Sequence, residues 1–109
     1  MARPTEILKG TLALLILRTL ELEPRHGVAI ADRIEQITRG TFTVKAGSLF
    51  PALHRLEQEG FITGEWSVTD AGRRVKSYRL TSAGRQQLAL EKKQWTRIVS
   101  AIGLVLESD

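Results

Sequence analysis

The feature that most constrains the fold is one helix, expected over about residues 46–59, whose two ends are both marked in the sequence. Gly47 and Ser48 stand at its start, where short polar residues satisfy the free backbone N–H groups of a first turn. Pro51 falls in or just after that turn, the part of a helix that tolerates proline. Gly60 follows the last turn, where a residue that readily adopts positive φ ends a helix.

The two faces of this helix differ in chemistry. At about 100° per residue, Leu49, Leu53 and Leu56 fall within one narrow sector and predict a side that faces the core. The other side carries no acid before Glu57, and its residues are Gly47, Ser48, Pro51, His54 and Arg55. Such a face suits the major groove of DNA, where bulky or acidic side chains would be excluded or repelled. An ordinary amphipathic surface helix is the alternative that this stretch alone leaves open.

Size and composition limit the classes of function. The chain has 109 residues, enough for one core, and its net charge of +4 favours an anionic partner. It has no cysteine, and its two histidines, His26 and His54, are too far apart for a short metal motif, so we expect neither a metal nor another cofactor. The apolar run Leu12–Leu17 is too short to span a bilayer and no cleavage site follows it, which makes the cytoplasm the expected location.

The residues give little support to an enzyme. The sequence has no cysteine nucleophile, no glycine-rich phosphate loop and no paired histidines. His54 and Glu57 are neighbours three apart on a helix, a spacing that favours a surface interaction over an acid–base pair. We therefore expect a protein without catalytic residues.

A first helix is expected near the N-terminus. Arg3–Glu6 resembles a helix start, with proline and an acid at the positive end of the helix dipole, and the helix would run to about Leu20. Its apolar face is too wide for one contact. The helix therefore packs both on its own domain and on a partner subunit, or else it is simply deeply buried.

A second helix is expected over about 26–38, after a turn at Glu23–Gly27, and Gly40 would end it. Thr41–Val44 alternates over a short stretch and adds at most one β-bridge. The second and third helices then form a helix-turn-helix. The residues expected on the inner face of the second helix are Ala29, Ile30, Ile34 and Ile37.

A β-hairpin is expected after the third helix, with strands over about 61–68 and 73–80 around a turn at 69–72. Its basic residues are Arg73, Arg74, Lys76 and Arg79, set against Asp70 in the turn. A hairpin with a basic tip is a wing, placed to reach phosphates beside a groove of DNA. The alternative is a solvated hairpin whose basic edge residues prevent aggregation.

A long last helix is expected from Thr81–Gly84 to about Leu106. We expect it to pair two chains, because its apolar stripe extends far beyond the hairpin; packing across its own domain is the alternative. Residues 1–80 would then form the DNA-binding domain and residues 81–109 the dimerisation helix. The apolar stripe consists of Leu88, Trp95 and Ile102 at seven-residue intervals, with Ile98 or Val99 and then Val105 or Leu106 at the intervening positions.

The order of elements predicts a mainly α fold with a small β-hairpin: a winged helix-turn-helix followed by a long C-terminal dimerisation helix. Segments along nearly the whole chain match the pattern of a known family. They are Lys9-Gly10-Thr11-Leu12, Leu15-Ile16-Leu17, His26-Gly27 with Ile30, Gly47 through Glu57, Glu59-Gly60-Phe61-Ile62, Tyr78-Arg79-Leu80-Thr81 and Ala83-Gly84. On these segments the sequence resembles the PadR family of bacterial transcriptional regulators, in the short form with a single C-terminal helix.

The resemblance implies a homodimeric repressor of transcription, and some members of the family respond to small hydrophobic or phenolic ligands. In the short-chain members a pocket lies between the subunits, and Trp95 is the aromatic residue best placed to line one here; the alternative is that Trp95 is only a packing anchor. The family commonly has tyrosine at the positions of Val28 and Phe50, so two hydroxyl groups that could touch phosphates are missing.

Two functions remain open from the sequence. The first is binding of duplex DNA, with Ser48, Pro51 and Arg55 at base edges or the groove wall and Arg55 bidentate to guanine. The residues expected to contact phosphates are Lys45, Arg73, Arg74 and Lys76. The second is a winged-helix module that binds proteins, a role that the same fold also serves. Steep loss of affinity with salt would indicate DNA, whereas an apolar docking module would lack it.

Overall fold

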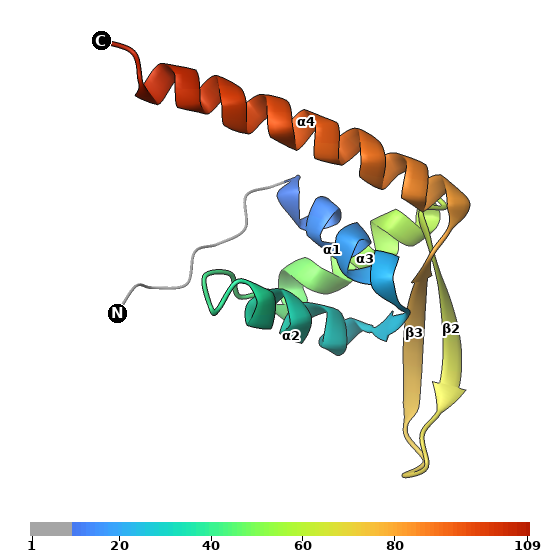
Figure 1. Cartoon of the computed structure of the whole chain (residues 1–109). Coiled ribbons are helices and arrows are strands. Elements are labelled where there is room, and N and C mark those ends of the chain that lie inside the picture. Colours follow the sequence, from blue (N-terminus) through green and yellow to red (C-terminus); the bar gives the residue numbers. More distant parts are fainter. Residues whose placement is uncertain (1–9) are drawn as a thin grey trace.

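The computed structural model describes residues 10–109, which form helices and a three-stranded antiparallel sheet (Figure 1). The predicted helix start at Arg3–Glu6 lies outside the described residues. The architecture is the predicted one, mainly α with a small β-hairpin and a long C-terminal helix. In chain order the elements are α1 (Thr11–Leu22), β1 (Arg25–His26), α2 (Gly27–Ile37), α3 (Ala46–Gln58), β2 (Ile62–Val68), β3 (Arg74–Leu80) and α4 (Ser82–Leu106).

Gly10 interrupts the first predicted helix. Its φ of +96° is left-handed, so the prediction of one unbroken helix from the N-terminus to Leu20 is wrong at this position. The helix α1 follows Gly10 and extends to Leu22, slightly beyond the predicted end. Ile16 and Leu17 are fully buried, and α1 therefore lies at the centre of the hydrophobic core.

The second helix is confirmed, but its end differs from the prediction. Ile30 and Ile34 are buried as expected, whereas Ile37 is 56% exposed, so its predicted inward position is wrong. Ile37 is the last residue of α2, and the chain turns away from the core after it. The turn begins at Arg39, with φ of +52°, before Gly40 with φ of +78°. A non-glycine residue thus takes the left-handed position that usually falls to glycine.

The sheet contains one strand that the sequence did not indicate. The predicted turn at Glu23–Gly27 includes the short strand β1, which pairs Arg25 with Tyr78 and His26 with Ser77. The strand order is β1–β3–β2, and β2 pairs with β3 along its whole length. Figure 1 shows the β2–β3 hairpin projecting from the helical body. β1 covers the edge of β3 near the body and anchors the base of the hairpin.

The helix α3, the sheet and α4 meet at one junction. The left-handed Gly60 (φ +80°) follows α3, and the Phe61 N–H closes its last turn by donating to the Leu56 carbonyl at 3.0 Å. The Thr81 N–H donates to the Phe61 carbonyl at 3.1 Å. The Thr81 hydroxyl donates to the Gly60 carbonyl at 2.7 Å and accepts from the Gly84 N–H at 3.0 Å, which caps α4 as predicted.

The helix α4 has a buried start and an exposed remainder. Leu88 is only 1% exposed and belongs to the core of its own chain, so its side chain has no free surface for a second subunit. After Glu91, every side chain of α4 except Gly103 is exposed, and Figure 1 shows this part running past the body. The exposed members of the predicted stripe are Trp95, Ile98, Val99, Ile102, Val105 and Leu106.

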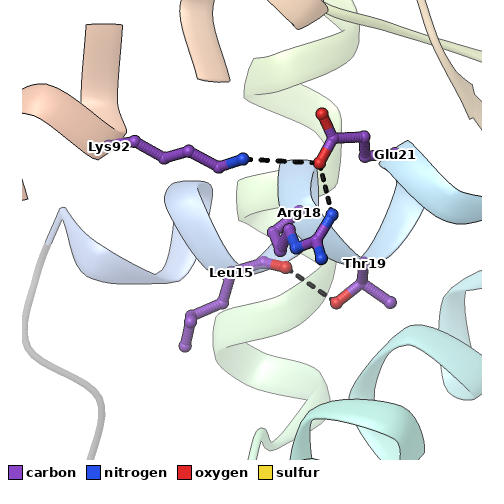
Figure 2. A network of polar contacts seen from close by, with 5 residues as sticks. All are labelled: Leu15, Arg18, Thr19, Glu21 and Lys92. Carbon is purple, nitrogen blue, oxygen red and sulfur yellow. Dashed lines mark hydrogen bonds and ion pairs between the residues drawn. The ribbon is translucent and has the colours of Figure 1, made fainter. Parts of the chain in front are cut away.

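Polar contacts link α1 to α4 at one edge of the body (Figure 2). The Glu21 carboxylate accepts a hydrogen bond from the Arg18 guanidinium and lies 3.5 Å from the Lys92 ammonium of α4. The hydrogen bond from Arg18 and the charge of Lys92 hold the pKa of Glu21 below its ordinary value. Within α1, the Thr19 hydroxyl donates to the Leu15 carbonyl at 2.7 Å, which satisfies a buried polar group.

The tight approach at Gly84 predicts that Gly84→Ala destabilises the fold. A β-carbon at Gly84 would collide with the backbone oxygen of Phe61 and would lie 2.8 Å from Leu80 Cδ1. Overpacking of this kind costs about 3 kcal/mol or more when a backbone atom must move. We expect the midpoint of thermal or urea unfolding to fall accordingly, although helix propensity alone predicts a gain.

Gly47→Ala is the matched control for that measurement. Gly47 also lies inside a helix, but a β-carbon there would meet nothing within 4 Å. Its substitution should raise the free energy of unfolding by up to about 1 kcal/mol. Equal gains in both variants would contradict the close contact between Gly84 and Phe61.

Candidate nucleic-acid interface

The helix α3 has one buried face and one exposed face, as its sequence predicts. Leu49, Leu53 and Leu56 are buried against the other helices. The predicted outer face is solvent-exposed at each of its positions, which are Gly47, Ser48, Pro51, His54 and Arg55. The buried leucines hold the helix on the body while the small, polar and basic face remains available to a ligand.

The sequence suggested that Ser48 caps the start of α3, but the structure shows no such cap. Lys45 occupies the N-cap position without a side-chain capping bond, and the Ser48 N–H donates to the Lys45 carbonyl at 3.0 Å. The first turn of α3 contains no acidic residue, and the Lys45 side chain is exposed beside it. The positive end of the helix dipole and a lysine therefore lie together, an arrangement that favours an anion such as a phosphate.

Pro51 lies inside α3 and changes the backbone chemistry of the exposed face. Proline has no N–H, so it cannot donate the helical hydrogen bond to the carbonyl of Gly47 four residues earlier. The carbonyl of Gly47 therefore lacks the donor that an α-helix ordinarily supplies four residues later.

A groove of about 490 Å³ separates α3 from the hairpin and reaches the start of α2. Phe50 and His54 line it from α3, and Trp66 and Arg74 line it from the hairpin. Val28 of α2 completes the apolar part of the lining; Val28, Phe50 and Trp66 are 63%, 47% and 56% exposed, respectively. The groove therefore combines exposed apolar surface with basic side chains.

The start of α2 packs closely against α3 where both line this groove. A β-carbon at Gly27 would lie 3.2 Å from Phe50 Cε1 and 3.4 Å from Leu53 Cδ1. A larger residue at Gly27 would push the ring of Phe50 away from the body. The bare backbone of Gly27 thus positions the Phe50 ring.

The tip of the hairpin presents arginine side chains. The Arg73 N–H donates to the Thr69 hydroxyl at 3.1 Å, and the Gly72 N–H donates to the Thr69 carbonyl at 2.9 Å, which together shape the turn. The guanidinium of Arg74 lies 4.7 Å from the centroid of the Trp66 ring. Stacking of this kind orients a guanidinium while leaving its N–H groups available for phosphate or carboxylate. Both arginines are exposed.

Lys76 differs from the arginines, because its ammonium group faces the protein. Its Nζ lies 2.8 Å from Glu57 Oε1 in the last turn of α3. The hydrogen bond to Glu57 raises the pKa of Lys76 above its ordinary value. Burial raises the pKa of the neighbouring Tyr78 hydroxyl, which keeps that group neutral. The predicted set of phosphate contacts thus contains one lysine that already has an anionic partner.

A second groove, of about 510 Å³, lies on the other flank of α3, between α1 and α4. Ser48, Pro51 and Arg55 line it from α3, and Gln87 and Glu91 line it from α4. The predicted DNA-binding residues therefore fall on two flanks. His54, Arg74 and Lys76 border the hairpin side, whereas Ser48, Pro51 and Arg55 border the α4 side.

Sequence reasoning had not selected Val28, Phe50 or Trp66 as contact residues. Phe50 stands four positions before His54, so the helical spacing places both on one face of α3. That spacing was the available signal for Phe50. Trp66 and Val28 come from other elements, and only the packing of α2 and the hairpin around α3 brings them into the same groove.

The side chains and helices of residues 10–109 also bear on metal binding and on membrane insertion. No cluster of three or more His, Cys, Asp or Glu side chains in this part of the chain could hold a metal ion. None of the helices described here is both long enough and apolar enough to cross a membrane.

Comparison with known proteins identifies the family. The model of the transcriptional regulator PadR-like family matches residues 16–90. An uncharacterized protein from Lysinibacillus sphaericus is 33% identical over 104 residues, which cover 94% of each chain. A protein named as a transcriptional regulator from Mycobacterium tuberculosis is 39% identical over 59 residues, or 54% of each chain.

Solved structures agree with this match. A PadR family transcriptional regulator from Eggerthella lenta is 30% identical with a TM-score of 0.82, and the match covers 93% of this chain and 86% of that one. A PadR family regulator from Clostridium difficile is 30% identical with a TM-score of 0.76, covering 89% and 99% of the two chains. The chain therefore belongs to the PadR-like family of transcriptional regulators, which bind DNA.

Proposed function

We propose that this regulator binds duplex DNA as a homodimer and represses transcription by occupying a promoter. In this proposal α3 enters the major groove, the hairpin tip contacts phosphates beside it, and α4 joins two copies of the chain. The observation that carries the proposal is that His54 of α3 and Arg74 of the hairpin border one groove. The helix α4, which carries the apolar stripe, lies on the side of the body opposite to α2 (Figure 1).

The exposed face of α3 supports direct reading of base edges. Its first two turns carry no acidic side chain, and the helix is narrow at Gly47 and Ser48, which lets the backbone approach the floor of the groove. Arg55 is the candidate for a bidentate contact to guanine, because its exposed guanidinium offers donors in the required fork. Lys45 and the start of α3 would contact a phosphate at the groove edge.

The exposed stripe of α4 supports pairing of two chains. An α-helix rises about 1.5 Å per residue, so the exposed half of α4 is several turns long. Monomeric proteins rarely leave an apolar stripe of that length in water. A second copy of the same helix matches the stripe by symmetry. The two α3 helices of the dimer would then have to reach successive major grooves, about 34 Å apart.

Repression by occupancy requires only that the dimer binds DNA. In this proposal α3 and the hairpin bind the duplex and α4 pairs the two chains. A bound dimer covers the promoter and excludes polymerase. A winged-helix module that binds proteins is the competing function, and the salt dependence of binding separates the two.

The hairpin arginines give the first test of DNA binding. Arg73→Ala and Arg74→Ala should each weaken binding about equally on operator and random duplexes, because a phosphate contact carries no sequence information. Each substitution should reduce the slope of log K against log salt by about 0.9. Fluorescence anisotropy at several salt concentrations measures both quantities.

Arg79→Ala is the matched control on the same strand. Arg79 is exposed and lies 3.7 Å from Glu65, on the face of β3 opposite to Arg74. Its removal should leave the salt slope unchanged. If the double substitution of Arg73 and Arg74 left the slope unaltered as well, the hairpin would have no part in the interface.

The stripe of α4 gives the test of the dimer. Trp95→Ala and Ile102→Ala should each weaken dimerisation by about 2 kcal/mol, or roughly thirtyfold in Kd, if they are central to the interface. Affinity for the operator should fall with them. Sedimentation velocity over a range of protein concentrations measures the monomer–dimer equilibrium.

Leu104→Ala controls for the loss of apolar surface. Leu104 is 72% exposed and stands two residues after Ile102, on the opposite face of α4. Its substitution should leave dimerisation unchanged. A wild-type protein that stays monomeric at micromolar concentrations would contradict the proposed assembly.

We further propose that Trp95 responds to a flat aromatic effector bound between the subunits. Trp95 is 42% exposed near the middle of α4, and a ring stacked on it would quench its fluorescence. A changed angle between the subunits would alter the spacing of the α3 helices and release the operator.

The test uses Trp66→Phe, which leaves Trp95 as the only tryptophan. Planar phenolic compounds are titrated while operator release is followed by anisotropy, after confirming that this variant still binds DNA. We expect quenching and release at the same ligand concentration. Quenching without release would make the site incidental, and the lack of both would leave Trp95 as a packing residue.

A further inference from the structure

Glu57 and Lys76 join the recognition helix to the hairpin. Glu57 lies in the last turn of α3 and Lys76 near the middle of β3, and their charged atoms are 2.8 Å apart. The lysine side chain is 24% exposed and the glutamate side chain 31%. An ion pair between two half-buried side chains on different elements fixes the distance between those elements more firmly than a fully solvated pair does.

The fold leaves space for this contact. Gly64 of β2 lies beneath the lysine side chain, and a β-carbon there would collide with Lys76 Cε and come within 3.2 Å of Glu57 Oε2. The ammonium group lies 5.3 Å from the centroid of the Tyr78 ring and 5.7 Å from that of Trp66. The side chain of Lys76 therefore passes over Gly64 and near the rings of Trp66 and Tyr78 before its ammonium group reaches α3.

The energetics favour keeping the lysine on Glu57 when DNA binds. If Lys76 moved to a phosphate, Glu57 would lose its partner while lying close to the polyanion. A carboxylate without its partner in a half-buried position is costly, and repulsion from nearby phosphates would add to that cost. The other titratable groups that line this groove are His26, His54, Arg74 and Tyr78, and none of them is a carboxylic acid. Glu57 is therefore the single carboxylate that faces Lys76 from this lining.

We propose that Glu57 acts as an internal anion that retains Lys76, so that Lys76 positions the hairpin against α3 and does not neutralise a DNA phosphate. This inference rests on the proposed DNA-binding function and assigns Glu57 and Lys76 as positioning residues. A fixed hairpin lets α3 and the arginines engage one register of the duplex. Glu57 thereby favours the operator over random DNA in two ways, by holding that geometry and by withholding one cation from phosphates of any sequence.

Four proteins test the proposal: wild type, Lys76→Met, Glu57→Gln and the double variant. Affinities for an operator selected with the wild-type protein and for a random duplex are measured over a range of salt. Circular dichroism verifies that each variant is folded. Lys76→Met should keep the salt slope of the wild type, because no phosphate contact is lost. Its affinity for the operator should fall about tenfold, and by more than its affinity for random DNA.

Glu57→Gln should have the opposite signature on random DNA. The amide keeps the size of the side chain but loses its charge, and the released lysine can then bind a phosphate. We expect the salt slope to steepen by about 0.9 and the affinity for random DNA to rise. Adding Lys76→Met to Glu57→Gln should abolish that extra slope, which identifies Lys76 as its source.

Two outcomes would overturn the proposal. If Lys76→Met alone lowers the slope by about one unit, as expected for Arg74→Ala, the lysine contacts a phosphate in the wild type. If Glu57→Gln leaves the slope unchanged, Glu57 does not withhold the cation. Should Glu57→Gln fail to fold, the salt slope of Lys76→Met compared with that of the wild type still decides whether Lys76 contacts a phosphate. Lys76→Met keeps an apolar side chain of similar length in place.

A separate measurement distinguishes this inference from the DNA-binding proposal. The ammonium signal of Lys76 in ¹⁵N-labelled wild-type protein should be slowed in exchange by its bond to Glu57, both with and without DNA. Loss of that signal in Glu57→Gln would identify it. If the wild type binds no DNA, the proposed function fails, while the ammonium signal still reports whether the ion pair forms; an exchange rate like that of a free lysine refutes the pair itself.

Discussion

The contact between Gly84 and the backbone of Phe61 sets how α4 leaves the sheet. The Phe61 carbonyl accepts the Thr81 N–H, and the absence of a β-carbon at Gly84 lets the first turn of α4 lie against it. Because Gly60 also bonds to the Thr81 hydroxyl, the end of α3, the base of the sheet and the start of α4 form one rigid crossing. The direction of α4 relative to α3 is therefore set by backbone atoms, which deform less than side chains.

This crossing gives the proposed function its mechanical basis. A dimer formed through α4 would present two α3 helices at a separation that depends on the angle at which α4 leaves the sheet. The link from Glu21 to Lys92 adds a second point of attachment between α1 and α4 (Figure 2). In such a dimer, a ligand that tilts one α4 against the other would thus move the two α3 helices relative to each other without bending either protomer. A small change in the distance between the α3 helices is enough to prevent both from entering successive major grooves.

Charge is distributed over the proposed interface in two ways. Arg73 and Arg74 project from the hairpin tip and are available to phosphates, whereas Lys76 is held by Glu57 at the base of the groove. The sequence places all of these cations on one hairpin and cannot separate them. In the proposed interface the exposed arginines contribute to non-specific affinity, whereas the retained lysine contributes to the geometry on which specificity depends.

The elements whose causes are local could be predicted from the sequence alone. The spacing of Leu49, Leu53 and Leu56, the turn at Gly60 and the Thr81 cap specify helices and their ends within a few residues of chain. Features that depend on residues distant in the sequence became visible in the folded structure. The strand β1 exists because β3 offers a free edge, Leu88 is buried because α1 lies over it, and Lys76 turns inward because Gly64 and Glu57 make room and supply a charge. A pattern of residue types records which side chains are apolar or charged, but burial and ion pairing are set by the partners that folding brings within reach.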